Sequence, residues 1–213
     1  MKRLRVVAML ILCIALPSAG FAQTELSGPQ SGTLGPGTYY VIGDVSVQLG
    51  DTLEIVPGTE FLHDGNHTWI IQGLLTAQGS MGDSIKFVRQ DTIQAHRWGG
   101  LRFQSSASPD CILDYCVIDH VYIPSSHPVD YHGGGIYIYE VDLTILNSRI
   151  SNCLAQANGG GIYAKDAAIT IDNCLIIENE EYGNGVGGGI SLYNCDGALI
   201  THSIIAYNSS GGT

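Results

Sequence analysis

The chain has 213 residues, of which 20 are acidic and nine are basic, so its formal net charge at pH 7 is −11. This charge repels phosphate backbones and anionic lipid headgroups, and we therefore expect no nucleic-acid partner and no docking on acidic membranes. Glycine occurs 28 times. Many of these glycines recur in a fixed pattern, which makes internal repeats the first feature to consider.

The first 22 residues have the pattern of a secretory signal peptide. Three basic residues within the first five positions precede an apolar run from Val6 to Leu16, and small residues surround the expected cleavage site after Ala22. The apolar run ends at Pro17 and is too short to span a bilayer. We therefore expect an exported chain, extracellular or on the outer cell surface, with no membrane span in this segment.

Residues 23–94 alternate short apolar stretches with Gly, Pro and Asp turns. We interpret this region as an N-terminal cap followed by irregular first coils of a repeat array, because such arrays need atypical ends. The strands expected here are Val45–Val47, Leu53–Ile55, Trp69–Ile71, Leu74–Ala77 and Ile85–Val88.

Residues 95–213 are built from a unit that restarts on glycine. Triplets beginning at Gly133, Gly159 and Gly187 are 26 and 28 residues apart, and Trp98–Phe103 is an earlier, weaker copy. A further pair, Gly211-Gly212, begins another unit. Each unit holds alternating apolar stretches, which predict three short strands and no helix.

Three strands in one such unit predict one coil of a right-handed parallel β-helix, an all-β solenoid. A single coil cannot bury its apolar face, so coils stack at about 4.8 Å and like residues form ladders. Cys116 and Cys174 share one ladder two coils apart, too far for a disulfide, so we expect free thiols. A β-sandwich does not predict units of fixed length, and no leucine-rich frame is present.

The glycine triplets are expected to turn the chain between coils, where positive φ angles and close stacking exclude a side chain. A phosphate-binding loop is the alternative, but it needs a helix after the glycines. The stretch Ile136–Tyr139 that follows the first triplet has a strand pattern instead.

The unit IxN…GGGIY resembles the repeats of polymorphic outer-membrane proteins, and residues 43–103 are similar to the first coils of secreted β-helix proteins with a pectin-lyase-like fold. The asparagine falls 17, 18 and 19 residues after the last glycine of its unit, so the register slips. The matching pieces are Ile150-Ser151-Asn152, Ile177-Glu178-Asn179 and Ala206-Tyr207-Asn208.

The resemblance implies a β-helix displayed at the cell surface or released from the cell. It does not imply one activity, because this fold occurs in adhesins, lyases, hydrolases and epimerases. Proteins of the outer-membrane kind continue into a further module, whereas this sequence stops at the start of a coil with an open edge. We therefore expect the sequence to be part of a longer protein.

The first candidate site is an outward column on the strand after the glycines. Ile136 and Ile138 are expected to point inward, so the alternate side chains point outward and align between coils. Tyrosine rings and cations suit sugar rings and uronate carboxylates, so we predict an extracellular polysaccharide as partner. A plain solvent-facing ladder is the alternative, because tyrosine favours strands. The column contains Arg102, Gln104, Tyr137, Tyr139, Tyr163, Lys165, Ser191 and Tyr193.

Two loops contain residues of metal-ligating types. Their spacings match no known metal motif, and the calcium-binding nonapeptide GGxGxDxUx is absent. We therefore expect no cofactor, with Ca²⁺ as the alternative at the acidic loop. The candidates are His120, His127, Asp130 and His132 in the first loop, and Glu178, Glu180 and Glu181 beside Asn184 in the second.

A catalytic site would need paired carboxylates, or carboxylates that hold Ca²⁺ together with a basic residue. Asp114 and Asp172 occupy one outward ladder position, but Leu146 lies between them. No catalytic motif matches residue by residue. The expected function is therefore non-catalytic, adhesin-like or polysaccharide-binding. The alternative is a polysaccharide lyase or epimerase that acts on acidic polysaccharide.

Overall fold

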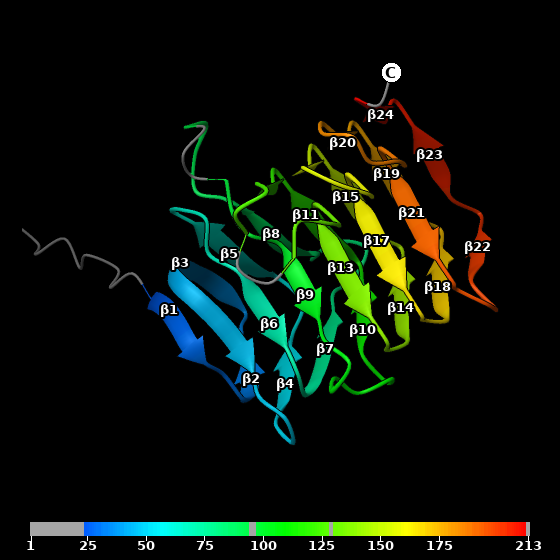
Figure 1. The fold of residues 1–213 in the computed structure, drawn as a ribbon. Coiled ribbons are helices and arrows are strands. Elements are labelled where there is room, and N and C mark those ends of the chain that lie inside the picture. Colours follow the sequence, from blue (N-terminus) through cyan, green and yellow to red (C-terminus); the bar gives the residue numbers. More distant parts are fainter. Residues whose placement is uncertain (1–23, 94–96, 128–129, 212–213) are drawn as a thin grey trace, which may run out of the picture.

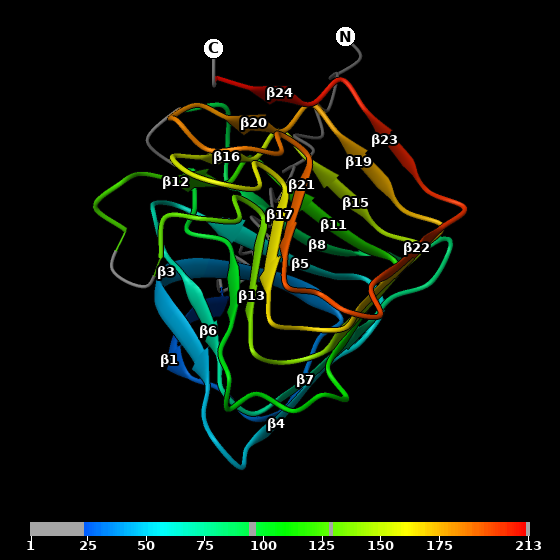
Figure 2. The same ribbon diagram turned by 45° about the vertical axis from the view of Figure 1, so that its right-hand side comes forward.

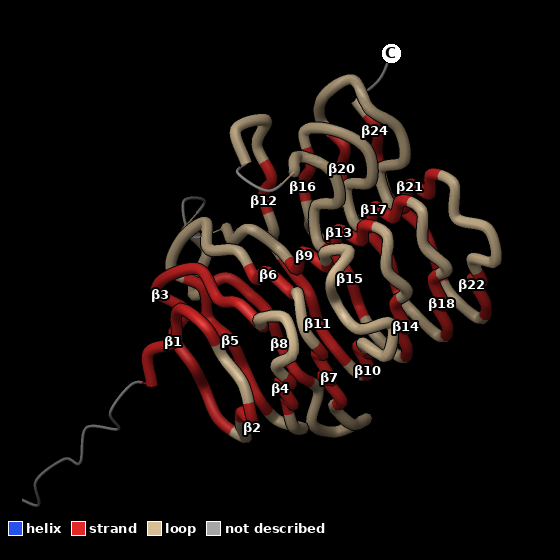
Figure 3. Tube along the Cα trace, turned by 60° about the horizontal axis from the view of Figure 1, so that its bottom comes forward, coloured by secondary structure: helices blue, strands red, loops and turns tan. Residues whose placement is uncertain are grey.

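The computed structural model describes residues 24–93, 97–127 and 130–211, and the expected signal peptide lies outside these ranges. Every regular element within them is a strand (Figures 1 and 3). Successive coils pair through parallel strands, and the chain advances along the stack from β1 to β24. No helix of this part of the chain is long and apolar enough to cross a membrane.

The strands stand in four rows, which Figure 2 shows as the sides of the stacked coils. Row A consists of β6 (Trp69–Ile71), β9 (Leu101–Phe103), β13 (Ile136–Tyr139), β17 (Ile162–Lys165) and β21 (Ile190–Tyr193). Row B consists of β2 (Gly32–Leu34), β4 (Thr52–Ile55), β7 (Leu74–Gln78), β10 (Ile112–Asp114), β14 (Leu143–Leu146), β18 (Ile169–Asp172) and β22 (Leu199–Thr201).

Row C consists of β5 (Thr59–His63), β8 (Ile85–Arg89), β11 (Cys116–Asp119), β15 (Arg149–Ser151), β19 (Leu175–Ile177) and β23 (Ile204–Ala206). Row D consists of β12 (Tyr122–Ile123), β16 (Leu154–Ala155), β20 (Glu180–Glu181) and β24 (Ser209–Ser210). The three predicted strands per coil correspond to rows A, B and C. Row D was not predicted, and it gives the later coils a fourth side.

The N-terminal region belongs to the same stack of coils and contains one long strand. Strand β3 (Gly37–Val47) turns a corner, because its first half pairs with β5 in row C and its second half with β6 in row A. Strand β1 (Thr24–Pro29) pairs along β3 at the end of the stack. All five strands expected in this region are present, with β1, β2, β5 and the first part of β3 in addition.

The core runs the length of the stack and is filled by the inward residues of rows A, B and C. Near its N-terminal end Phe61, Phe87 and Trp69 form an aromatic cluster, with ring centroids 4.8 to 5.3 Å apart. Burial of each such ring stabilises the fold by a few kcal/mol, on the order of 2–3. Much of the stability of the first coils therefore comes from the packing of these large side chains.

His63 is a buried polar member of that cluster. Its Nδ1 donates to the carbonyl oxygen of Val88 at 2.8 Å, its Nε2 accepts from the indole of Trp69 at 3.0 Å, and its ring stacks on Trp98. Burial lowers the pKa of His63 to about 3. The ring is therefore neutral at physiological pH and serves the packing of the core.

The glycine triplets turn the chain between coils, as predicted. Gly133, Gly159 and Gly187 have φ angles of 59°, 75° and 77°. Close stacking leaves no room for a side chain at the second glycine of each triplet. A Cβ on Gly134, for example, would lie 1.8 Å from the carbonyl oxygen of Gly160. The triplets are therefore a requirement of the solenoid.

The expected ladder of small residues is also present. The Ser148 hydroxyl accepts from the backbone N–H of Cys116, and the Ser203 hydroxyl accepts from that of Cys174. The cysteines in the described residues are all free thiols, which confirms the expectation for Cys116 and Cys174. Burial raises the pKa of the Cys116 thiol well above its ordinary value. The thiol is therefore unreactive, and the side chain serves to pack the core.

One matching piece of the repeat was wrongly aligned. Ile150 pairs with Ile176, which places Asn152 outside the ladder, at a φ of 53°. Cys153 occupies the ladder position instead, and its N–H donates to the side-chain oxygen of Asn179 at 3.1 Å. The N–H of Asn179 donates in turn to Asn208. The step from 17 to 18 residues thus reflects a cysteine that replaces the asparagine in one coil. The step from 18 to 19 reflects one extra residue between β21 and β22, where the pairing offset rises from 28 to 29.

Candidate functional site

The outward column of row A has the predicted register. Tyr137 lies between Arg102 and Tyr163 in neighbouring strands, and Tyr139, Lys165 and Tyr193 align beside them. The inward alternation is confirmed as well, because Ile136 and Ile138 are fully buried. The coil spacing and the period of the strand therefore place the six aromatic and charged members of the column on one face of the molecule: Arg102, Tyr137, Tyr139, Tyr163, Lys165 and Tyr193.

Half of this column is covered, contrary to the expectation that all its members face solvent. Arg102 is 0 %, Tyr137 7 % and Tyr163 6 % exposed. The segment after β12 passes over them: the His132 ring stacks on Tyr163 with centroids 4.5 Å apart, and Asp130 hydrogen-bonds Tyr137. Burial and the carboxylate raise the pKa of Tyr137, which stays a neutral phenol.

Arg102 is a structural residue in this position. Its guanidinium donates to the carbonyl oxygens of Gly99 and His132 at 3.0 Å, of Gly134 at 2.9 Å, and of Gly133. Burial lowers its pKa. Because its donors are committed to backbone oxygens of its own coil and of the next, Arg102 is not available to an incoming ligand.

The other half of the column is open, and we name Tyr139, Lys165 and Tyr193 the Lys165 ladder. The Lys165 ammonium lies 5.4 Å from the ring centroid of Tyr139 and 5.7 Å from that of Tyr193. Tyr193 is 59 % exposed. A cation between two aromatic faces holds all three side chains in place.

Aromatic contacts connect this ladder with the covered half. The Tyr137 ring stacks at 6.4 Å from Tyr139 and at 5.9 Å from Tyr163. His132 then stacks on Tyr163, and Tyr131 lies 5.0 Å beyond His132, with 47 % of its surface exposed. An aromatic path therefore leads from the Lys165 ladder through the buried tyrosines to the exposed ring of Tyr131 in the loop.

The loop residues of metal-ligating types are not arranged as a metal site. His120 Nδ1 bonds its neighbour Asp119, while His127 Nε2 lies 3.0 Å from the Thr68 hydroxyl. Asp130 accepts from the N–H of His132 at 2.9 Å. Across the described residues no group of three or more His, Cys, Asp or Glu side chains is arranged to hold a metal ion.

In the acidic loop, Glu181 also bonds to groups of the protein itself. Glu181 is fully buried, and its Oε1 accepts from the N–H groups of Gly183 at 2.6 Å and Gly185 at 2.9 Å. Its other oxygen accepts from the Ser210 hydroxyl. Glu178 lies at a turn with a φ of 57°. Glu181 therefore shapes the loop, and the calcium alternative has no set of converging carboxylates here.

The carboxylates considered for catalysis are separated as predicted. Leu146 pairs with Asp114 on one side and with Asp172 on the other. Asp172 accepts from Thr201 and His202, and these bonds lower its pKa. Each carboxylate thus belongs to its own local network, and the two do not form an acid–base pair.

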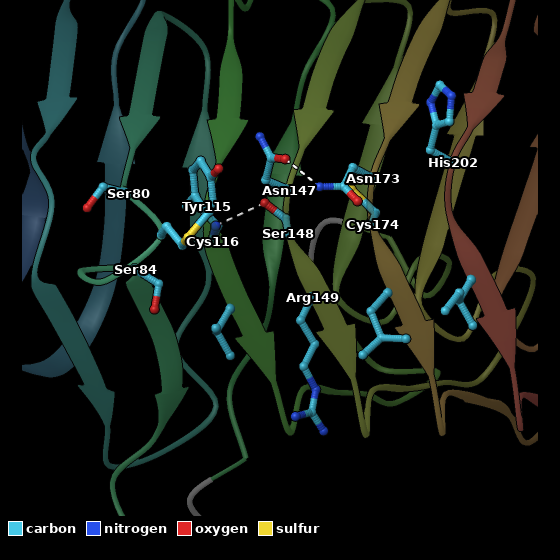
Figure 4. Close-up of a pocket in the computed structure, with 14 residues that line it drawn as sticks. Ser80, Ser84, Tyr115, Cys116, Asn147, Ser148, Arg149, Asn173, Cys174 and His202 are labelled. Atoms are coloured by element: carbon cyan, nitrogen blue, oxygen red, sulfur yellow. Dashed lines mark hydrogen bonds between the residues drawn. The ribbon is translucent and has the colours of Figure 1, made fainter.

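A groove of about 400 Å³ that the sequence did not predict lies at the corner between rows B and C (Figure 4). Two of its polar residues bond across the coils, because Asn173 donates to Asn147 at 2.7 Å (Figure 4). Asn147 donates in turn to Asp114, outside the groove, at 2.8 Å. Cys116 and Cys174 form part of its floor. Because these amides already bond one another, the groove offers few free groups to a ligand.

A second cavity, of about 350 Å³, opens beside Tyr131, at the end of the aromatic path. We name it the amide pocket. Sequence reasoning missed it, although its residues come shortly before the three glycine triplets, and the alignment of these coil ends could have indicated it. The pocket is lined by Tyr131, His132, Gln156, Ala157, Asn158, Asn184 and Gly185.

Comparison with known proteins agrees with this architecture. A family model described as right handed beta helix region matches residues 80–213, which is more than half of the chain. The chain therefore belongs to the right-handed β-helix family, and the expected all-β, right-handed parallel β-helix is confirmed. No curated protein and no solved structure was found to match the chain.

Proposed function

We propose that this chain is an exported, non-catalytic β-helix segment that binds extracellular polysaccharide through the open half of row A. The observation that carries the proposal is the Lys165 ladder, in which an ammonium group is held between the rings of Tyr139 and Tyr193. Aromatic faces stack on the C–H faces of sugar rings, and an ammonium group donates to sugar hydroxyls. A stiff parallel sheet presents these groups with little loss of conformational freedom on binding.

The charges around the ladder favour a neutral polysaccharide over a uronate polymer. Arg102 is committed to backbone carbonyls, which leaves Lys165 as the cation of the open column. Acidic residues follow directly after two of the strands, Glu140 after β13 and Asp166 after β17. With a net charge of −11 on the whole chain, an anionic polymer would be repelled.

The extracellular location rests on the N-terminal pattern and on the resemblance to surface proteins. A basic start, an apolar run and small residues before position 23 are typical of export. The resemblance to polymorphic outer-membrane repeats and to pectin-lyase-like β-helices supports display at the cell surface or release. Carboxylates bonded within local networks favour binding over lyase or epimerase chemistry.

The double variant Tyr139→Ala/Tyr193→Ala tests this proposal by affinity electrophoresis in gels that contain an uncharged glucan or mannan. Loss of two stacking faces is expected to weaken retention by about tenfold or more. Tyr207→Ala is the matched control, because Tyr207 is 86 % exposed and lies outside row A. Equal retention of the double variant and the parent would contradict the proposal, and unsaturated uronate released from pectate would favour the lyase.

A further inference from the structure

The amide pocket has the groups and the size to hold one sugar residue. Its volume of about 350 Å³ lies in the range of small-ligand cavities. Tyr131 supplies an exposed aromatic face at its rim. Gln156, Asn158 and Asn184 supply side-chain amides, each with a carbonyl acceptor and two N–H donors. Sugar hydroxyls are donors and acceptors at once, so amides can satisfy them in either role.

One polar atom of this lining lacks a protein partner within the described ranges: His132 Nδ1 is buried without a hydrogen bond. Gln156 is half-buried and Asn184 is exposed, so their amides are accessible from the pocket. Buried polar atoms in native proteins are nearly always paired. The unpaired His132 Nδ1 atom therefore points to a polar ligand or water at this cavity.

The walls of the pocket are held in place by hydrogen bonds between coils. The Tyr131 carbonyl oxygen accepts from Ala157 N–H at 3.1 Å, and the Asn158 side chain accepts from Val186 N–H at 2.8 Å. Glu181 fixes the loop that presents Asn184, through Gly183 and Gly185. A preformed cavity reduces the entropy lost when a ligand binds.

The pocket carries no fixed charge. Its lining contains no Lys, Arg, Asp or Glu side chain. Burial and the nearby cations Lys165 and Arg102 lower the pKa of His132, although Asp130 acts in the opposite direction, so that ring is neutral at pH 7. An anionic sugar would enter without a cation to pair with it, whereas a neutral hydroxylated sugar meets matching amides.

We infer that the amide pocket is a second subsite, which takes one neutral sugar residue of the same polysaccharide that the Lys165 ladder binds. The inference rests on the proposed function, because the two sites are the ends of one aromatic path. That path runs from Tyr139 through Tyr137, Tyr163 and His132 to Tyr131. A chain that spans both ends would gain affinity from each.

Isothermal titration with uncharged hexose oligosaccharides of increasing length tests the subsite. In the parent protein, affinity is expected to rise again once the oligosaccharide reaches from the ladder to the pocket. The double variant Gln156→Ala/Asn184→Ala should lose that second rise and bind the longest oligosaccharide about tenfold more weakly. The control variant Gln48→Ala/Asn66→Ala removes two exposed amides outside the pocket. It should retain the second rise in affinity.

The outcomes separate the subsite from the function on which it rests. If the pocket variant keeps the full length dependence while Tyr139→Ala/Tyr193→Ala loses binding, the subsite is excluded and the proposed function stands. If the folded parent binds no uncharged oligosaccharide of any length, the proposed function and the subsite both fail. Circular dichroism of each variant excludes loss of the fold as the cause.

Discussion

Gly134→Ala is expected to lower the free energy of unfolding by roughly 3 kcal/mol. A Cβ at this position would lie 1.8 Å from the carbonyl oxygen of Gly160 and 3.2 Å from the Cβ of Cys153. The neighbouring atom is backbone, fixed by the N–H···O bonds that stack one coil on the next, so it cannot move away without separating coils. Urea unfolding followed by circular dichroism measures the change.

Gly82→Ala is the matched control, because a Cβ there meets no atom within 4 Å. It should leave stability unchanged or raise it slightly, since alanine restricts the unfolded chain. If Gly134→Ala proves as stable as Gly82→Ala, the coils are not stacked as closely as described. The interpretation of the glycine triplets as stacking residues would then be wrong.

Arg102→Leu is expected to destabilise the fold by roughly 3–5 kcal/mol. Leucine fills part of the space but removes the donors that satisfy the carbonyl oxygens of Gly99, His132, Gly133 and Gly134. Those buried acceptors would lose their partners on both sides of the coil boundary. Chemical unfolding reports the loss.

Two substitutions serve as controls for Arg102. Arg149→Leu makes the same chemical change at an exposed position, where the guanidinium bonds the Ser151 hydroxyl, and should cost well under 1 kcal/mol. Arg102→Lys keeps the charge with fewer donors and should fall between the parent and Arg102→Leu. A stable Arg102→Leu protein that had lost polysaccharide retention would instead make Arg102 a ligand-binding residue, as the sequence alone suggested.

The strands were predictable where apolar residues alternate and the glycines fix the register. Strand β5 was not predicted, because two of its inward residues, Thr59 and His63, are polar although they are fully buried. Their polarity hides the alternation of apolar and polar residues. Row D was not predicted for a different reason. Its strands are two residues long, as in Glu180–Glu181, and too short to show a period.

The alignment of the candidate residues in one column was predictable from the sequence, but their exposure to solvent was not. Strand period and coil length determine that Tyr137 and Tyr163 share the outer face, but nothing in that period shows where a loop will fold. Asp130 and His132 cover the two tyrosines through contacts between different coils. The same argument applies to the amide pocket, whose walls come from the turns of successive coils.

Hydrogen–deuterium exchange with and without an uncharged polysaccharide tests the central claim most directly, because it locates the bound polymer on the fold. The account predicts slower exchange in two sets of segments. The first is the ends of β13, β17 and β21, and the second is residues 130–132, 156–158 and 183–185. Protection confined to the corner groove of Figure 4, or no protection at saturating polysaccharide, would contradict it.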